Sequence, residues 1–168
     1  PDAEVSAVNI KTGSSVSALT DKLINSKGST WQSASGGANS FFNDYVSPDA
    51  VFSGETTINM TFKKARTVRA IMIYNAASAA VAFDAVKHIE FTCADGTVKY
   101  IDNLAFDAET GTYTLAAYQG ETTGDEKFIC GASAADFSEL QVTSVKITVA
   151  PGADKAEVGI GEIVLFGK

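Results

Sequence analysis

Three oxygen-bearing side chains near the two ends of the chain have the chemistry of a site for a hard cation. Asp21 offers a carboxylate, Thr30 offers a hydroxyl, and the polar segment between them offers backbone carbonyls. Calcium takes about six to eight such oxygens in a flexible shell. The sequence therefore predicts a structural calcium site in which Asp21, Thr30 and Glu162 converge and carbonyls of residues 22–28 complete the shell. The alternative is a plain surface loop with a helix cap or an Asx-turn at Asp21.

Glu162 enters this prediction because of its place in the last predicted strand, residues 158–167. It has the same parity as Ile160 and Val164, so we expect its carboxylate on a face that otherwise buries apolar groups. A buried carboxylate needs a partner. In the calcium hypothesis the partner is the cation, and in the alternative it is an amine such as that of Lys22.

A second group of residues combines aromatic rings with amide and carboxyl groups in predicted loops. This combination suits a pyranose, whose apolar face packs on an aromatic ring while its hydroxyl groups bond to polar side chains. Functional residues also favour loops on a rigid scaffold. The alternative for each ring is packing onto the edge of the fold. The predicted ligand-binding residues are Phe41, Phe42, Asn43, Asp44, Tyr45 and Tyr118.

Signals for catalysis are weak. His88 is the only histidine, which excludes a histidine-rich zinc site and weakens any triad that needs this residue. It falls on the polar side of its strand, without partners, and we expect it to be exposed and inert. Acidic clusters such as that of Asp102 and Asp107 are expected to lie in polar loops with their carboxylates in solvent. No nucleophile elbow or phosphate loop is present. The sequence thus predicts a protein that is not an enzyme.

Charge and cysteine content narrow the remaining classes. With 13 basic and 20 acidic residues, the net charge is −7, and an acidic surface repels phosphate backbones and anionic lipid. We therefore expect no nucleic acid as a partner. Because no segment approaches the length of a transmembrane helix, we also expect no membrane insertion. Cys93 and Cys130 are the only cysteines, and we favour buried free thiols over a disulfide. The abrupt start at Pro1 indicates a mature or trimmed piece of a longer protein.

Short segments with period-two alternation indicate the elements that must position these residues. Residues 57–62 and 86–93 alternate apolar and polar side chains, as half-buried strands do, and residues 142–149 do the same. Residues 67–75 suit a central strand, and Ala94-Asp95-Gly96 marks a hairpin. Shorter strands are expected near residues 1–12, 97–101, 112–118 and 127–130. The residues expected to face inward are Ile58, Met60, Phe62, Ile89, Phe91, Val145 and Ile147.

The remaining segments are predicted as connections. Lys63 to Arg66 reads as a basic turn, Ser47 to Glu55 as a loop and Ala132 to Leu140 as a connection. Residues 16–24 fit a short helix or turn. The alanine-rich residues 76–85 fit either a helical turn or an extended crossover. Many strands with turn signals between them, and no convincing amphipathic helix, predict an all-β protein, an antiparallel β-sandwich of jelly-roll type spanning residues 1–168 as one module.

The two ends of the chain together resemble a known family. Asp21 followed by a loop and by Ser29-Thr30-Trp31, with Gly161-Glu162-Ile163 and Leu165-Phe166-Gly167 near the end, is similar to discoidin or coagulation-factor type C domains and to bacterial family 32 carbohydrate-binding modules. In that family the first and last segments share a structural calcium, and the tryptophan packs structurally.

The resemblance implies a galactose-binding-like fold and a non-catalytic module, secreted or on the cell surface. Such a module holds a larger protein on a glycan, a polysaccharide or glycoconjugate, through weak contacts, and is covalently linked to other domains. A discoidin-type module that binds protein is the first alternative. A small glycan-active enzyme is the second.

Overall fold

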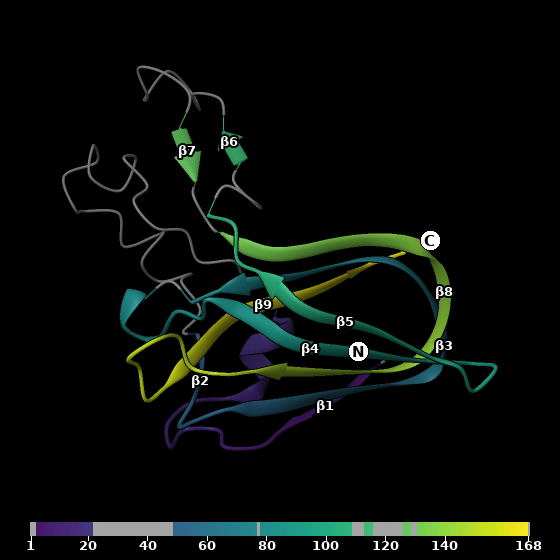
Figure 1. Cartoon of the computed structure of the whole chain (residues 1–168), viewed down its shortest axis with the longest axis horizontal. Coiled ribbons are helices and arrows are strands. Elements are labelled where there is room, and N and C mark those ends of the chain that lie inside the picture. Colours follow the sequence, from purple (N-terminus) through teal and green to yellow (C-terminus); the bar gives the residue numbers. More distant parts are fainter. Residues whose placement is uncertain are drawn as a thin grey trace.

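A computed structural model of the chain describes most of the predicted strands and the segments between them. Antiparallel strands dominate it, as the alternating segments predict (Figure 1). The residues described are 3–21, 49–76, 78–108, 113–115, 126–128 and 131–167. Among them, no helix is long and apolar enough to cross a membrane.

Eleven elements follow one another along the described chain, and only two of them are short 3-10 helices. Strand β1 spans Ala3–Ala7, and helix η1 spans Val16–Thr20. The strands β2, β3, β4 and β5 span Ala50–Phe52, Thr56–Asn75, Ala85–Cys93 and Val98–Ala105, and helix η2 spans Ala79–Val81. The last four strands, β6, β7, β8 and β9, span Tyr113–Leu115, Glu126–Phe128, Ala132–Val149 and Val158–Phe166.

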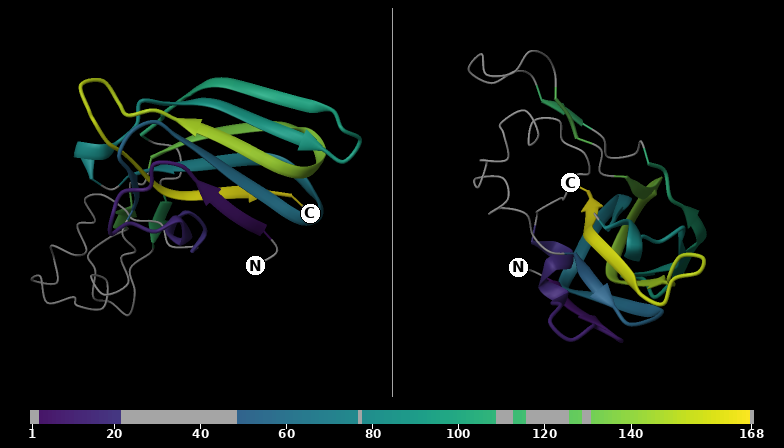
Figure 2. Two further views of the ribbon diagram at one scale, coloured as in Figure 1. Left: turned by 90° about the horizontal axis from the view of Figure 1, so that it is seen from below. Right: turned by 90° about the vertical axis from the view of Figure 1, so that its left-hand side faces the viewer.

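Two long strands, β3 and β8, organise the main sheet, whose strand order is β2-β9-β3-β8-β4-β5 with β1 also paired to β3. Residues 56–61 of β3 pair with the last third of β8 and with β1, and residues 66–74 pair with the first part of β8 and with β9. Each long strand therefore belongs to two half-sheets. In Figures 1 and 2 both strands bend together, so that one half-sheet folds over the other.

Irregular pairing marks the bend. Residues 62–65 of β3 stand opposite Thr143 alone, and residues 137–139 of β8 stand opposite Arg69 alone. Extra residues on one strand of a pair bend it and increase its twist. The predictions of a turn at Lys63 to Arg66 and of a connection at 132–140 are therefore wrong, because both segments continue their strands through bulges.

The core lies between the two half-sheets and agrees with the predicted inward face. Ile58, Met60, Ile89, Phe91, Val145 and Ile147 are buried, which confirms six of the seven predicted core residues. Phe62 is only partly buried and packs against the core from the edge of the bend. Removing one such side chain from water stabilises the fold by roughly 1.5–3 kcal/mol.

Asn75 fixes the crossover between β3 and β4. Its side-chain amide donates to the carbonyl of Phe83 at 2.8 Å, and its Oδ1 accepts from the backbone N–H of Ala76 and of Phe83, both at 2.9 Å. Asn75 is buried, so these bonds replace the water that it loses on folding. The segment that the sequence leaves undecided thus contains one short helical turn, η2, held by a buried amide.

Candidate functional site

Most of the predicted site lies outside the described residues. This holds for the ligand-binding residues Phe41, Phe42, Asn43, Asp44, Tyr45 and Tyr118, and for the predicted calcium ligand Thr30. Cys130 also lies outside, whereas Cys93 is a buried free thiol, as expected. These ligand-binding residues and Thr30 stay predictions, and Asp21 and Glu162 are the predicted site residues that the structure places.

Asp21 is the C-terminal capping residue of η1, and Glu162 lies in β9, which packs against η1. Helix η1 begins at a capping Ser15, whose Oγ accepts from the N–H of Ser17 at 3.2 Å. Buried Ala18 and Leu19 hold η1 on the main core. The turn that ends in Asp21 is therefore anchored on the strand that carries Glu162. The calcium prediction requires these two segments, from opposite ends of the chain, to lie close together.

The face on which Glu162 lies differs in part from the prediction. The pairing of β3 with β9 shifts between Tyr74, opposite Glu162, and Asn75, opposite Ile160. Because of this shift, Ile160 packs in the main core, whereas Val164 packs with Tyr74 in a second cluster. Glu162 thus shares the face of Val164 but not that of Ile160. It is nevertheless buried, with 3% of its surface exposed.

A second carboxylate, Asp49, lies beside this part of β9 and was not predicted as a site residue. A Cβ at Gly161 would lie 2.9 Å from the carbonyl oxygen of Asn75, which is too close for a side chain, and 3.6 Å from Oδ1 of Asp49, which is an ordinary contact distance. Asp49 directly precedes β2, which pairs with β9 through Ala50 and Ile160. The sequence analysis predicted Ser47 to Glu55 as a loop. Without strand β2, no pairing indicates that Asp49 lies beside β9.

These carboxylates have the chemistry that a calcium ion requires, but they do not form a complete shell. Within the described residues, no three histidine, cysteine, aspartate or glutamate side chains are gathered closely enough to hold a metal ion. A calcium ion between η1 and β9 would therefore need further oxygens from the residues between Asp21 and Thr30. That requirement is the one the sequence prediction states.

His88 has partners, contrary to the prediction. Its Nδ1 lies 2.5 Å from Oδ1 of Asp102 on the neighbouring strand, and its Nε2 lies 3.9 Å from Oε2 of Glu90. Its ring packs on Tyr100 with 5.3 Å between the ring centroids. The pairing of β4 with β5 places His88 opposite Asp102 and so explains this contact. Only 31% of the His88 side chain is exposed.

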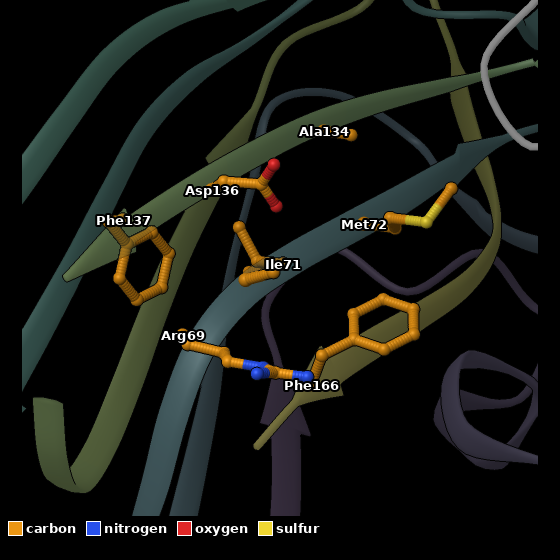
Figure 3. Close-up of a pocket in the computed structure, with 8 residues that line it drawn as sticks. Arg69, Ile71, Met72, Ala134, Asp136, Phe137 and Phe166 are labelled. Atoms are coloured by element: carbon orange, nitrogen blue, oxygen red, sulfur yellow. The ribbon is translucent and has the colours of Figure 1, made fainter. Parts of the chain in front are cut away.

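The described residues also form an open groove of about 510 Å³ (Figure 3). It lies on the half-sheet in which the later part of β3 pairs with the first part of β8 and with β9. We call it the outer groove and define it by six residues from three neighbouring strands. Arg69, Ala70 and Met72 come from β3, Ala134 and Asp136 from β8, and Phe166 from β9. Phe137 lines the groove as well and separates it from a smaller hollow of about 200 Å³.

Sequence reasoning missed the outer groove because it missed the strand that carries one wall. Residues 132–140 were predicted as a connection, so nothing placed Asp136 beside Arg69. The observed register puts Ala70 opposite both Asp136 and Phe166. The alternation of Ala134 and Asp136 with Ala135 and Phe137 was the available signal.

Comparison with solved structures identifies the fold. The chain is similar to the family 32 carbohydrate-binding module of NanJ from C. perfringens, solved in complex with galactose, with a TM-score of 0.56 and 13% identity over 98% of this chain and 93% of that chain. It is similar to the lectin domain of lectinolysin, solved with Lewis b antigen, with a TM-score of 0.54 and 10% identity over 98% and 92%.

A third similar structure is a GH29 fucosidase from Ruminococcus gnavus, with a TM-score of 0.58 and 15% identity. The match covers 99% of this chain but only 25% of the fucosidase. No protein-family model matches the sequence, and no curated protein matches it either. The predicted β-sandwich and its resemblance to family 32 modules and coagulation-factor type C domains are thus confirmed in the fold.

Proposed function

We propose that this chain is a non-catalytic carbohydrate-binding module that holds a larger secreted or cell-surface protein on a glycan. One observation carries the proposal: nearly the whole chain has the fold of modules that were solved with galactose or with the Lewis b antigen. The acidic net charge of −7 supports a partner without phosphate groups.

The fucosidase match supports the attachment of this module to other domains. There the same fold accounts for a quarter of a longer enzyme chain. A module of this kind raises the effective concentration of its partner domain near a glycan, so even weak sugar contacts suffice. The catalytic part then lies outside the module.

For the sugar site we propose Phe41, Phe42 or Tyr45 as the ring on which a pyranose packs. Asn43 or Asp44 would bond to its hydroxyl groups, and Tyr118 would add a further aromatic contact. The support comes from the sequence, where rings and short polar side chains stand next to one another among small residues. An apolar sugar face and a rim of hydroxyl groups need these two kinds of side chain.

For the structural cation we propose calcium, held by Asp21, Thr30 and Glu162 with carbonyls of residues 22–28, and with Asp49 as a further oxygen donor. Packing of η1 on β9 and the closeness of Asp49 to Gly161 support this arrangement. Calcium would neutralise these carboxylates and join the two ends of the chain. It would supply stability and would take no part in a reaction.

A glycan array tests the proposed function with the full chain. We expect binding to one or more neutral glycans and loss of that binding when Phe41, Phe42 and Tyr45 are all changed to alanine. The variant Tyr100→Ala, which removes an exposed ring elsewhere, serves as the matched control and should bind like the wild type. An array without binding, together with a pull-down that recovers one specific protein, would favour the discoidin-type adhesion module. Hydrolysis of an array glycan would show an enzyme.

A further inference from the structure

The outer groove contains polar side chains that the protein itself does not use. Within the described part of the chain, the side chain of neither Arg69 nor Asp136 makes a hydrogen bond or an ion pair. Arg69 carries five N–H donors and Asp136 an acceptor-only carboxylate, so both kinds of hydrogen-bonding group face solvent at one place. An exposed pair of this sort can meet a ligand without first breaking an internal contact.

The floor and one wall of the groove are apolar. Ala70 and Ala134 form the floor, because their small side chains leave space above the sheet. Met72 and Phe166 stand beside them, and Phe166 is 40% exposed, which makes it one of the few large apolar side chains on the described surface. Figure 3 shows Arg69 extending toward Phe166 and the carboxylate of Asp136 turned toward β3.

The register gives the groove its width. Phe166, Ala70 and Asp136 are direct neighbours across β9, β3 and β8. Adjacent strands lie about 4.8 Å apart, so the backbones that carry Phe166 and Asp136 are about 10 Å apart with only the methyl group of Ala70 between them. A pyranose ring fits in that space. The groove volume of about 510 Å³ also lies in the range of small-molecule sites.

The irregular pairing of β8 places Arg69 at the groove. Residues 137–139 stand opposite Arg69 alone, between the regular pairs Val68–Leu140 and Ala70–Asp136. Bulges of this kind re-aim side chains at sheet positions that contact ligands. Because β3 and β8 are both held on the core at either side of the bend, the positions of Arg69 and Asp136 are set by the scaffold.

We propose that the outer groove is a second glycan-binding site, which takes a neutral hexopyranose or a disaccharide of such units. Phe166 and Met72 cover the apolar face of the sugar, Asp136 accepts hydrogen bonds from two hydroxyl groups, and Arg69 donates to others. The ligand is neutral because Asp136 offsets the charge of Arg69 and the chain as a whole carries −7. An acidic or sulfated sugar would be repelled. The class of ligand rests on the proposed function, whereas the site is a different one.

The two methionines of the chain provide the test. Met72 lines the groove, and Met60 is buried in the core with 4% of its surface exposed. With ¹³C-labelled methionine methyl groups, the full chain gives one reporter of the groove and one internal control. The probes are D-galactose, N-acetyl-D-galactosamine, L-fucose and D-glucose, each titrated well beyond millimolar concentration.

We expect at least one probe to shift the Met72 signal in a saturable way while the Met60 signal stays fixed. Phe166→Ala and Asp136→Asn should each weaken the apparent affinity about tenfold or more, which corresponds to roughly 1.4 kcal/mol. Tyr100→Ala should bind as the wild type does. A Met60 signal at its wild-type chemical shift shows that each variant is folded.

Three results would overturn the proposal. The first is a Met72 signal that none of the four sugars moves. The second is an unchanged affinity in both Phe166→Ala and Asp136→Asn. The third is a Met72 signal that moves on dilution without sugar, since the groove would then be covered by a second copy of the chain.

The array and the Met72 signal together distinguish the two proposals. Glycan binding on the array with a Met72 signal that no sugar moves would leave the proposed function standing and remove only the groove site. A saturable shift that persists in the variant with Phe41, Phe42 and Tyr45 changed to alanine would place the sugar in the groove.

Discussion

Two rows of residues on the same face of the same three strands have opposite environments. The inner row crosses β9, β3 and β8 at Glu162, Tyr74 and Ala132, whose exposed fractions are 3%, 8% and 0%. The outer row, four residues along, consists of Phe166, Ala70 and Asp136, of which Phe166 is 40% exposed and Asp136 is also exposed. Each row contains one carboxylate and one aromatic ring.

The comparison shows that burial decides what these similar residues can do. A carboxylate in the buried inner row must be compensated within the fold, so Glu162 is suited to holding the structure together. Asp136 in the outer row keeps its water and makes no internal ion pair within the described part of the chain, so it is available to a ligand. The same reasoning applies to the rings of Tyr74 and Phe166. The following predictions test this contrast or extend it to the carboxylates of Asp21 and Asp95.

The largest difference is expected between the two carboxylates. Glu162→Gln should lower the free energy of unfolding by about 3 kcal/mol or more, because a neutral amide cannot replace a buried carboxylate in its contact with a cation or another charged partner. Asp136→Asn, the matched change in the outer row, should stay within about 0.5 kcal/mol of the wild type. Chemical denaturation of both variants measures this. Equal effects at the two positions would remove the contrast.

The second prediction concerns the proposed cation. A calcium chelator should lower the Tm of the wild type, and saturating calcium should restore it, because an ion that binds only the folded state stabilises by about 2.7 kcal/mol at a hundredfold excess over Kd. Asp21→Ala should abolish the response to both additions. Asp154→Ala removes a carboxylate from the turn before β9 and should leave the response intact. A melting curve indifferent to chelator and calcium, with no metal found by elemental analysis, would exclude the site.

The third prediction compares two alanines on β8. Ala132→Leu should destabilise by about 1–3 kcal/mol, because Ala132 is fully buried and the added methyl groups would overpack its surroundings. Ala134→Leu, two residues further on the same face, is exposed and should change stability by less than about 0.5 kcal/mol. It should instead fill the outer groove and block any sugar shift of Met72. If Ala134→Leu were as destabilising as Ala132→Leu, the outer row would not be a free surface.

The smallest effect concerns an exposed carboxylate that does have internal partners. The Thr97 hydroxyl, 2.6 Å from Oδ1 of Asp95, and the Thr97 backbone N–H, at 2.9 Å, lower the pKa of Asp95. A lowered pKa in the folded state gives stability that is present above the unfolded-state pKa and is lost as pH falls through the folded-state pKa. Thr97→Val should raise the pKa of Asp95 back toward its ordinary value, as an NMR titration of its carboxyl carbon would show. An Asp95 titration that Thr97→Val leaves unchanged would contradict this account.

The sequence predicted the regular parts of the fold well, because alternation reports directly on which side of a strand is buried. Ile58 and Met60 on one strand and Ile89 and Phe91 on the next lie in the core as predicted. The hairpin at Ala94-Asp95-Gly96 also joins the expected strands, since Gly96 has the positive φ of 85° that this turn needs.

The prediction failed where strands bend or are very short. Lys63 to Arg66 is polar and looks like a turn, but it is the outside of a bulge in β3. Strand β2 has only three residues, too few for a pattern to show, and Asp49 was missed with it. The candidate site residues could be predicted from the sequence only in part. Arg69, Asp136 and Phe166 come together through pairing between distant segments, and local sequence patterns do not encode that pairing.

The continuity of β3 and β8 through both half-sheets has a consequence for how the chain folds and unfolds. Neither half-sheet can lose β3 or β8 without loss of the same strand from the other half-sheet. Opening that separates these two strands in one half-sheet alone is therefore not a low-energy excursion. The pairing partners are also far apart in sequence, as Ala3 with Phe62 and Ile73 with Ile163 illustrate. Pairing between segments this far apart requires large loops to close before the stabilising contacts form, so we expect folding to be slow and cooperative. Amide protons in the middle of β3 and β8 should therefore exchange with solvent only through global unfolding, whichever layer they belong to.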